Sequence, residues 1–174
     1  MESSKTKYIR AITKIAIMVA IMCVISQISI PVGVIPITLQ TFVVAFAGYF
    51  LGLKKSIVAI VVYLSLGIVG APVFSMLRGG FDVLIGYTGG FLWGFIPLVI
   101  LCALLKDKKI GIPLGLLGVI LCHTVGVIQY MIVSGNDIWQ AILVSSLPFI
   151  LKDFILVVLA YFLAERMRKI KAIN

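Results

Sequence analysis

The chain has 174 residues, of which 62% are hydrophobic and 12% are charged, and its mean hydropathy is +1.23. A soluble domain of this size could not bury so much apolar surface, so the composition excludes the soluble classes and makes lipid the solvent. The formal net charge of +9 then reflects membrane topology and attraction to anionic lipid of the bilayer, and we expect no nucleic-acid partner.

Continuous apolar runs, bounded by Gly, Pro or charged residues, define the elements that the sequence predicts. A membrane-spanning helix needs about 20 residues, and six such runs fit into one transmembrane domain over residues 1–174. We therefore predict an all-α, polytopic membrane protein of six transmembrane helices with both termini cytoplasmic. The predicted spans lie near 11–30, 38–53, 56–74, 86–105, 111–133 and 140–164.

The distribution of basic residues supports an even number of spans. Thirteen of the fifteen Lys and Arg residues form four clusters, which six spans would bring to one face of the membrane. Basic residues are retained on the cytoplasmic side of short loops, so this face is predicted to be cytoplasmic. The clusters are Lys5, Lys7, Arg10 and Lys14; Lys54 and Lys55; Lys106, Lys108 and Lys109; and Arg166, Arg168, Lys169 and Lys171.

Two charged neighbours, Lys152 and Asp153, lie in the outer half of the sixth predicted span, after Pro148. An ionisable group at membrane depth is costly and usually lines a cavity or pairs with another charge. Two interpretations stay open. In the first, the residues have no role in binding: the two side chains neutralise each other, or Lys152 extends outward to the membrane surface. In the second, they anchor a small ligand. Adjacent helical residues point roughly 100° apart, so we expect them to hold different parts of such a ligand.

Glycines gather around the connection between the third and fourth predicted spans, where they permit positive φ and close backbone approach. Close helix packing accounts well for Gly67 but less well for the runs 78–80 and 86–90. We therefore expect part of this loop to face a ligand. The glycines are Gly67, Gly70, Gly79, Gly80, Gly86, Gly89 and Gly90.

Four ordered motifs carry a resemblance to a known family. They are VIPITLQTF at 34–42, YLSLGIVGAPVF at 63–74, GYTGGF at 86–91, and LPF at 147–149 ahead of Asp153. Together they resemble the biotin-uptake family called BioY, the substrate-binding subunits (S components) of energy-coupling factor vitamin transporters. The resemblance covers about residues 11–164.

The resemblance implies a subunit that binds biotin near the outer surface, under the first and third outer loops. Such subunits deliver the vitamin with a membrane coupling (T) subunit and two cytoplasmic ATPase subunits. The sequence contains no G-x-x-x-x-G-K-[ST] phosphate loop, which fits a subunit without its own ATPase. We expect no catalytic residue, no metal site and no cofactor, with biotin as the transported substrate.

Several residues become candidates for binding biotin. Asp153 is expected to accept hydrogen bonds from the ureido N–H groups, and Lys152 or Arg78 to neutralise the carboxylate. Further candidates come from the motifs or from nearby aromatic positions: Gln40, Tyr87, Thr88, Gly89, Phe91, Trp93 and Phe149.

The sequence departs from the family pattern at three positions. The family usually reads G-P-T-G-G-Y, whereas Tyr87 and Phe91 stand here in place of the proline and the tyrosine, and Leu156 replaces a lysine three residues after the helix-six aspartate. Lys152 lies one turn before Leu156 on the same face and could supply that ammonium. These departures leave lipoate or another carboxylate-tailed compound as alternatives to biotin.

The first predicted span contains the pattern Ala16-x-x-x-Ala20. Small residues four apart share one helical face and allow another helix to approach closely. In the family, such residues of the first helix contact the coupling subunit, so Ala16 and Ala20 are the candidate partner-binding residues.

Two other function classes were weighed. An intramembrane enzyme would need a nucleophile with a base, but the single histidine, His123, lies beside Cys122 in an apolar run and the acidic residues are dispersed. We expect His123 to be a packed residue with one hydrogen-bonded neighbour, and the three cysteines to serve in packing. A solitary channel or secondary transporter is disfavoured because no inverted repeat is evident and few charges are buried.

The charge pattern makes a topological prediction. Single cysteines introduced beside Lys54–Lys55 and Lys106–Lys109 should react with an impermeant thiol reagent only from the cytoplasmic side. Labelling of either loop from outside intact cells would contradict the six-span topology.

Overall fold

The computed structural model describes residues 4–104 and 110–173, the last three by backbone only. The predicted cluster Lys106, Lys108 and Lys109 lies outside the described residues. The described part is mostly helical. Its helices are α1 (Ser4–Ile25), α2 (Gln40–Leu51), α3 (Leu53–Ile68), α4 (Phe81–Ile85), α5 (Gly89–Leu104), α6 (Gly111–Ser134), α7 (Ile138–Ser145) and α8 (Leu147–Ile173), with a short 3-10 helix at Ser75–Leu77.

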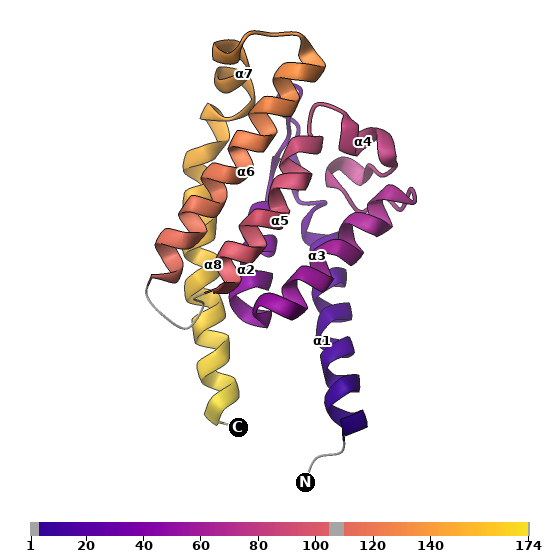
Figure 1. Ribbon diagram of the computed structural model, residues 1–174, viewed down its shortest axis with the longest axis vertical. Helices are drawn as coiled ribbons and strands as arrows, with labels where there is room; N and C mark the ends of the chain where they lie inside the picture. The colour runs from indigo at the N-terminus through magenta and orange to yellow at the C-terminus, as the bar shows by residue number, and fades with distance from the viewer. Residues whose placement is uncertain (1–3, 105–109, 174) are drawn as a thin grey trace.

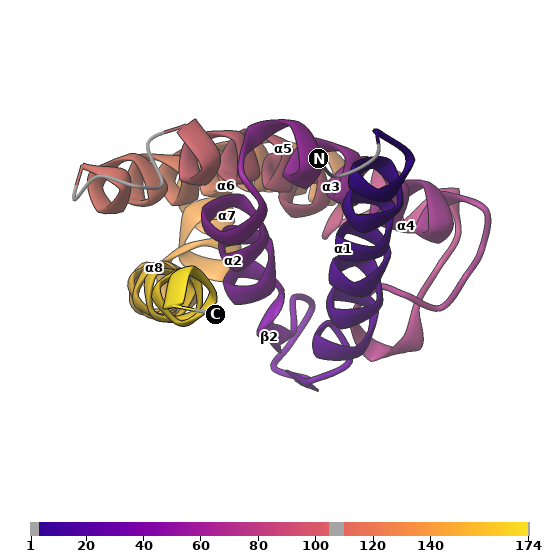
Figure 2. The same ribbon diagram turned by 90° about the horizontal axis from the view of Figure 1, so that it is seen from below.

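Helix α5 lies at the centre of the bundle, packed against α6, α2 and α3. Helix α8 packs on α2 and α6, and α1 packs on α3 and α2. Seen along the bundle, α1 and α8 lie on opposite sides of α2 (Figure 2). In the described residues, α1, α6 and α8 are long and apolar enough to cross a membrane, and α2 and α5 are shorter apolar helices. The six-span topology stays a prediction.

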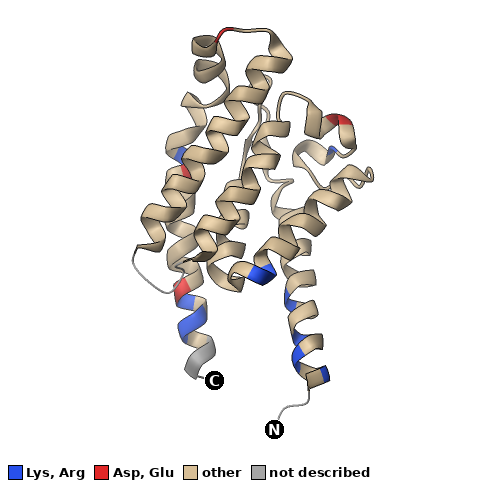
Figure 3. Ribbon diagram, viewed as in Figure 1, with Lys and Arg blue, Asp and Glu red and all other residues tan. Residues whose placement is uncertain are grey.

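Both termini lie at the same end of the bundle (Figure 1). The Lys and Arg residues of α1, of the α2–α3 junction and of the carboxyl-terminal part of α8 gather at this end (Figure 3). The structure thus brings the described basic clusters to one end, as the loop charges predict.

Glycines end two of the helices at the positions where the chain must turn. The α2–α3 junction is the single residue Gly52, whose φ of +76° suits glycine and whose N–H donates to the Gly48 carbonyl. Helix α6 ends at Gly135, in the left-handed conformation with φ +70°, and its N–H donates to the Met131 carbonyl. Each glycine satisfies a carbonyl that the helix end would otherwise leave without a partner.

The last predicted span, 140–164, is two helices in the structure. Helix α7 ends at Ser145, Ser146 has non-helical φ/ψ of −122° and −52°, and α8 begins at Leu147. Pro148 lacks an N–H and therefore fits the first turn of a new helix better than the interior of a long one. The first span also differs: α1 begins at Ser4 and ends at Ile25. The chain then forms a two-stranded hairpin, β1 (Ser29–Ile30) and β2 (Ile37–Thr38).

Helices α5 and α6 approach backbone to backbone at Gly94. A Cβ atom at this position would lie 2.7 Å from the Cys122 Cα and 2.9 Å from the Cys122 carbonyl oxygen. Since neither atom belongs to a flexible side-chain end, the two helices would have to separate to admit a larger residue.

We therefore expect Gly94→Val to lower the free energy of unfolding by about 1–3 kcal/mol, which overpacking typically costs. Thermal unfolding in detergent measures the effect, with Thr124→Val as the control because Thr124 is exposed on α6. Equal midpoints for the two variants would show that the α5–α6 contact is not tight.

Candidate functional site

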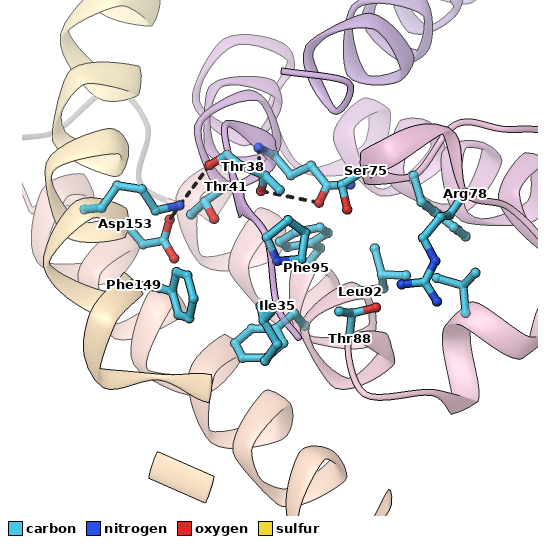
Figure 4. A pocket seen from close by; sticks show the side chains of 16 residues that line it. Ile35, Thr38, Thr41, Ser75, Arg78, Thr88, Leu92, Phe95, Phe149 and Asp153 are labelled. Atoms are coloured by element: carbon cyan, nitrogen blue, oxygen red, sulfur yellow. Dashed lines mark hydrogen bonds and ion pairs between the residues drawn. The ribbon is translucent and has the colours of Figure 1, made fainter. Parts of the chain in front are cut away.

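A pocket is lined by the β1–β2 hairpin, the 74–78 segment, and the helices α2, α4, α5 and α8 (Figure 4). Its floor and walls are largely aromatic or aliphatic, and its polar groups come from separate elements. The lining residues are Ile35, Pro36, Thr38, Gln40, Thr41, Phe74, Ser75, Arg78, Val83, Thr88, Phe91, Leu92, Phe95, Phe149, Lys152 and Asp153.

The hairpin covers one side of this pocket. Strand pairing sets Ser29 opposite Thr38 and Ile30 opposite Ile37. The turn between them contains Gly33 with φ +67°, a conformation that glycine adopts without strain. Ile35 and Pro36 are buried and face the pocket, while the residues at the tip of the turn are exposed.

Asp153 is the buried charge of the site, with 5% of its surface exposed. The Lys152 Nζ lies 2.7 Å from its Oδ1 atom, and the His123 Nε2 lies 3.0 Å from its Oδ2 atom. Among the described residues none donates a hydrogen bond of good geometry to Oδ1. The carboxylate is therefore paired in charge, yet Oδ1 can still accept a hydrogen bond from a ligand.

Lys152 makes a second contact, since its Nζ donates to the Thr38 carbonyl oxygen at 2.8 Å (Figure 4). The structure thus confirms that the two side chains pair with each other, and both line the pocket; their role as ligand anchors stays a prediction. The expectation that the two side chains hold different parts of a ligand stays a prediction. Leu156, where the family carries lysine, does not line this pocket.

Arg78 lies on the opposite side of the pocket from Asp153 (Figure 4). It is exposed, and its guanidinium makes no hydrogen bond or ion pair with any residue that the structure describes. The preceding residues Met76 and Leu77 have φ of +61° and +57°, which costs energy in non-glycine residues. The Gln27 Oε1 accepts from the Leu77 N–H at 2.9 Å and helps to hold this turn.

Gln40 is buried at the start of α2 and lines the pocket. Its Nε2 donates to the Tyr63 hydroxyl at 2.8 Å, and that hydroxyl donates to the Val73 carbonyl at 3.0 Å. The Gln40 Oε1 has only a long contact of 3.5 Å from the Thr38 hydroxyl. This amide oxygen is therefore a second acceptor with capacity left for a ligand.

The predicted aromatic residues Phe91 and Phe149 line the pocket, and Thr88 does so as well. The Phe91 ring also meets the His123 imidazole edge to face, with centroids 5.5 Å apart. Sequence reasoning missed Leu92 and Phe95 on the same helix, although Phe95 follows Phe91 by one turn and so shares its face. It also missed Ile35, Pro36, Thr38, Thr41, Phe74, Ser75 and Val83.

Three predicted residues do not line this pocket: Tyr87, Gly89 and Trp93. Trp93 is partly exposed and its Nε1 donates to the Leu84 carbonyl at 3.2 Å. The Tyr87 ring lies against the Tyr130 ring, with centroids 5.8 Å apart.

Gly89 has a packing role in the structure. A Cβ atom there would lie 1.9 Å from the Leu84 carbonyl oxygen and 2.4 Å from the Gln129 Nε2. That Nε2 donates to the carbonyls of Leu84 and Gly86 at 2.8 and 2.9 Å, so α6 holds the turn between α4 and α5.

The partner-binding candidates lie apart from the pocket. Ala16 and Ala20 are exposed on α1, whose buried face is formed by Met18, Val19 and Met22. None of the described residues of α1 lines the pocket.

No group of three or more His, Cys, Asp or Glu side chains in the described residues could hold a metal ion. Ser146, His123 and Asp153 are hydrogen-bonded in the same order as the serine, histidine and aspartate of a catalytic triad. Ser146, however, is buried and does not line the pocket, so its hydroxyl does not face a substrate.

Comparison with known proteins gives a consistent result. The BioY family model matches residues 1–172. A biotin transporter BioY from Thermotoga maritima is 38% identical over 168 residues, covering 93% of this chain and 98% of that protein. A probable biotin transporter BioY from Pyrococcus horikoshii is 33% identical over 159 residues, covering 91% of this chain and 96% of that protein.

One solved structure matches almost throughout. It is the crystal structure at 2.1 Å of the S-component for biotin from an ECF-type ABC transporter, with a TM-score of 0.88 and 27% sequence identity. The match covers 97% of this chain and 95% of that chain.

Proposed function

The chain belongs to the BioY family, and from this premise we propose that it is the biotin-binding S component of an energy-coupling factor transporter. It is a membrane protein, and it has no catalytic activity and no cofactor of its own. It is a multi-pass protein of the plasma membrane, a single domain with six spans and cytoplasmic termini. It captures biotin at the outer surface and delivers it with a membrane coupling (T) subunit and two cytoplasmic ATPase subunits.

The observation that carries the assignment of the site is the Asp153 Oδ1 atom, a buried carboxylate oxygen of the pocket lining that lies 2.7 Å from the Lys152 ammonium but receives no hydrogen bond of good geometry from the described residues. Biotin offers two ureido N–H donors, and a buried N–H without an acceptor costs roughly 1–3 kcal/mol. Asp153 accepts from this end of the ligand. The Gln40 Oε1, with its single long contact, is placed to accept as well.

The biotin carboxylate needs a cation at the other end. Lys152 already contacts both Asp153 and the Thr38 carbonyl, whereas the Arg78 guanidinium has no partner among the described residues and lies across the pocket (Figure 4). Arg78 can grip a carboxylate with two parallel hydrogen bonds. Arg78 therefore anchors the carboxylate, and Phe91, Phe95 and Phe149 surround the apolar ring and tail.

Lipoate is the second candidate ligand, because it has a carboxylate and an apolar tail but no ureido group. It would bring no N–H donor to the Asp153 Oδ1, which would keep only its ion pair with Lys152. A competition assay therefore separates the two compounds: excess biotin, but not lipoate, should displace labelled biotin from the purified protein.

Asp153→Asn keeps the shape of the side chain and exchanges a charged acceptor for a neutral amide. We expect biotin to bind about ten- to a hundred-fold more weakly, which corresponds to about 1.5–3 kcal/mol for a hydrogen bond to a charged group. Calorimetric titration in detergent measures it, with Asp82→Asn as the control because Asp82 is exposed on α4 and does not line the pocket. Normal binding by the Asp153 variant would remove Asp153 from the site.

Biotin amide, which lacks the carboxylate, tests the cation. The unmodified protein should prefer biotin over the amide, and Arg78→Met should erase this preference while Lys54→Met, at the other end of the molecule, keeps it. Lys152→Met distinguishes the remaining possibility: loss of the preference in that variant alone would assign the carboxylate to Lys152.

The exposed face of α1 makes a separate prediction. Ala16→Leu or Ala20→Leu should leave biotin binding by the isolated protein unchanged but lower biotin uptake at least tenfold in cells that contain the coupling subunit and the ATPases, because a close helix approach is lost. Ile17→Phe, on a neighbouring exposed face, is the control. An equal loss of binding and uptake would mean that these alanines maintain the fold of this subunit.

A further inference from the structure

His123 of α6 connects two points of the chain that belong to α8 or adjoin it. Its Nδ1 lies 2.9 Å from the Ser146 Oγ, and its Nε2 lies 3.0 Å from the Asp153 Oδ2. Ser146 directly precedes α8, and Asp153 lies about two turns further along the chain in α8. All three residues are buried. The His123 imidazole thus contacts both the residue that precedes α8 and, about two turns further along, the Asp153 carboxylate at the pocket wall.

The partners determine which ring nitrogen carries hydrogen. An ionised carboxylate can only accept, so His123 donates from Nε2 to the Asp153 Oδ2. The Nδ1 atom of a neutral imidazole then accepts, and the Ser146 hydroxyl donates to it. A serine just before a helix often caps its first turn, but here the Ser146 hydroxyl donates a hydrogen bond to the His123 Nδ1.

The two carboxylate oxygens of Asp153 are therefore used differently. Oδ2 is held by His123, while Oδ1 forms the 2.7 Å ion pair with Lys152 and receives no hydrogen bond of good geometry from the described residues. Without the histidine, the carboxylate could rotate about its Cβ–Cγ bond and turn Oδ1, which lies 2.7 Å from the ammonium, away from the pocket. The pocket would then lose the acceptor that the ligand needs, although its charge would be unchanged.

We propose that His123 is a positioning residue for substrate recognition: with Ser146 it holds the Asp153 carboxylate so that Oδ1 faces the pocket and accepts from ligand N–H groups. This inference rests on the proposed role of Asp153 in binding. It assigns a function in recognition to a histidine that neither lines the pocket nor touches the ligand.

Two matched pairs of variants test the inference by calorimetric titration with biotin. His123→Leu removes the donor and should weaken binding tenfold or more, whereas His123→Gln places an amide N–H near the position of Nε2 and should restore affinity to within about threefold of the unmodified protein. Ser146→Ala should weaken binding several-fold. Ser145→Ala is its control, because Ser145 is equally buried but bonds only to the Ala141 carbonyl of its own helix.

The decisive measurement combines His123→Leu with Asp153→Asn. If His123 acts through Asp153, the double variant should bind biotin no more weakly than Asp153→Asn alone. A histidine that only maintains the fold would weaken both backgrounds equally, as would Val119→Ala, a buried core substitution one turn away on α6. Additive losses, or a His123→Leu variant with normal affinity, would overturn the inference.

The remaining outcomes separate this inference from the proposed function. Normal binding by Asp153→Asn removes Asp153 from the site, and the positioning role with it. Weak binding by Asp153→Asn with normal binding by both His123→Leu and Ser146→Ala refutes the positioning role alone. If His123→Leu does not fold, the comparison of Ser146→Ala with Ser145→Ala and the ¹⁵N resonances of the single histidine replace it as the test. We expect the resonances to show hydrogen on Nε2 and an Nδ1 signal that shifts in Ser146→Ala. Hydrogen on Nδ1 would contradict the proposed arrangement.

Discussion

The burial of the Asp153 carboxylate constrains the rest of this structure. An isolated charge in an apolar bundle costs several kcal/mol, and it persists only where partners surround it. Here the partners come from two helices: Lys152 on α8 itself and His123 on α6. The ammonium also reaches the Thr38 carbonyl of the hairpin. One charge thus requires that α6, α8 and the hairpin meet at the same place, and that place is the pocket.

Three polar groups of the pocket lining have incomplete hydrogen bonding. The Asp153 Oδ1, the Gln40 Oε1 and the Arg78 guanidinium each have fewer partners among the described residues than their chemistry permits. In a closed core such groups would destabilise the fold. They are tolerated at a pocket wall, where water or a ligand can supply the missing hydrogen bonds. A ligand that supplies all of these hydrogen bonds is preferred over one that contacts only the apolar walls.

Hydropathy and charge predicted most of the helices and the common end of the described basic clusters, because both depend on composition along the chain. Asp153, Lys152 and Phe149, which the sequence singled out, line one pocket in the structure, and their role in binding stays a prediction. The motifs could not show that Trp93 faces away, since the apolar pattern of α5 runs all round the helix and does not fix its orientation. The contact of Lys152 with the Thr38 carbonyl was equally hidden, because a backbone oxygen has no signature in the sequence. The His123–Asp153 contact depends on how α6 and α8 are registered against each other, which hydropathy does not encode.

The candidate pocket and the candidate partner-binding residues lie in different parts of the molecule. The exposed alanines are on α1, while the described lining residues of the pocket come from the other elements. The link between them runs through the two residues that follow α1: Ser26 donates to the Val73 carbonyl, and Gln27 accepts from the Leu77 N–H. These bonds hold the segment that ends at Arg78. The Arg78 side of the pocket is therefore connected to α1, whereas the Asp153 side is held by His123 of α6.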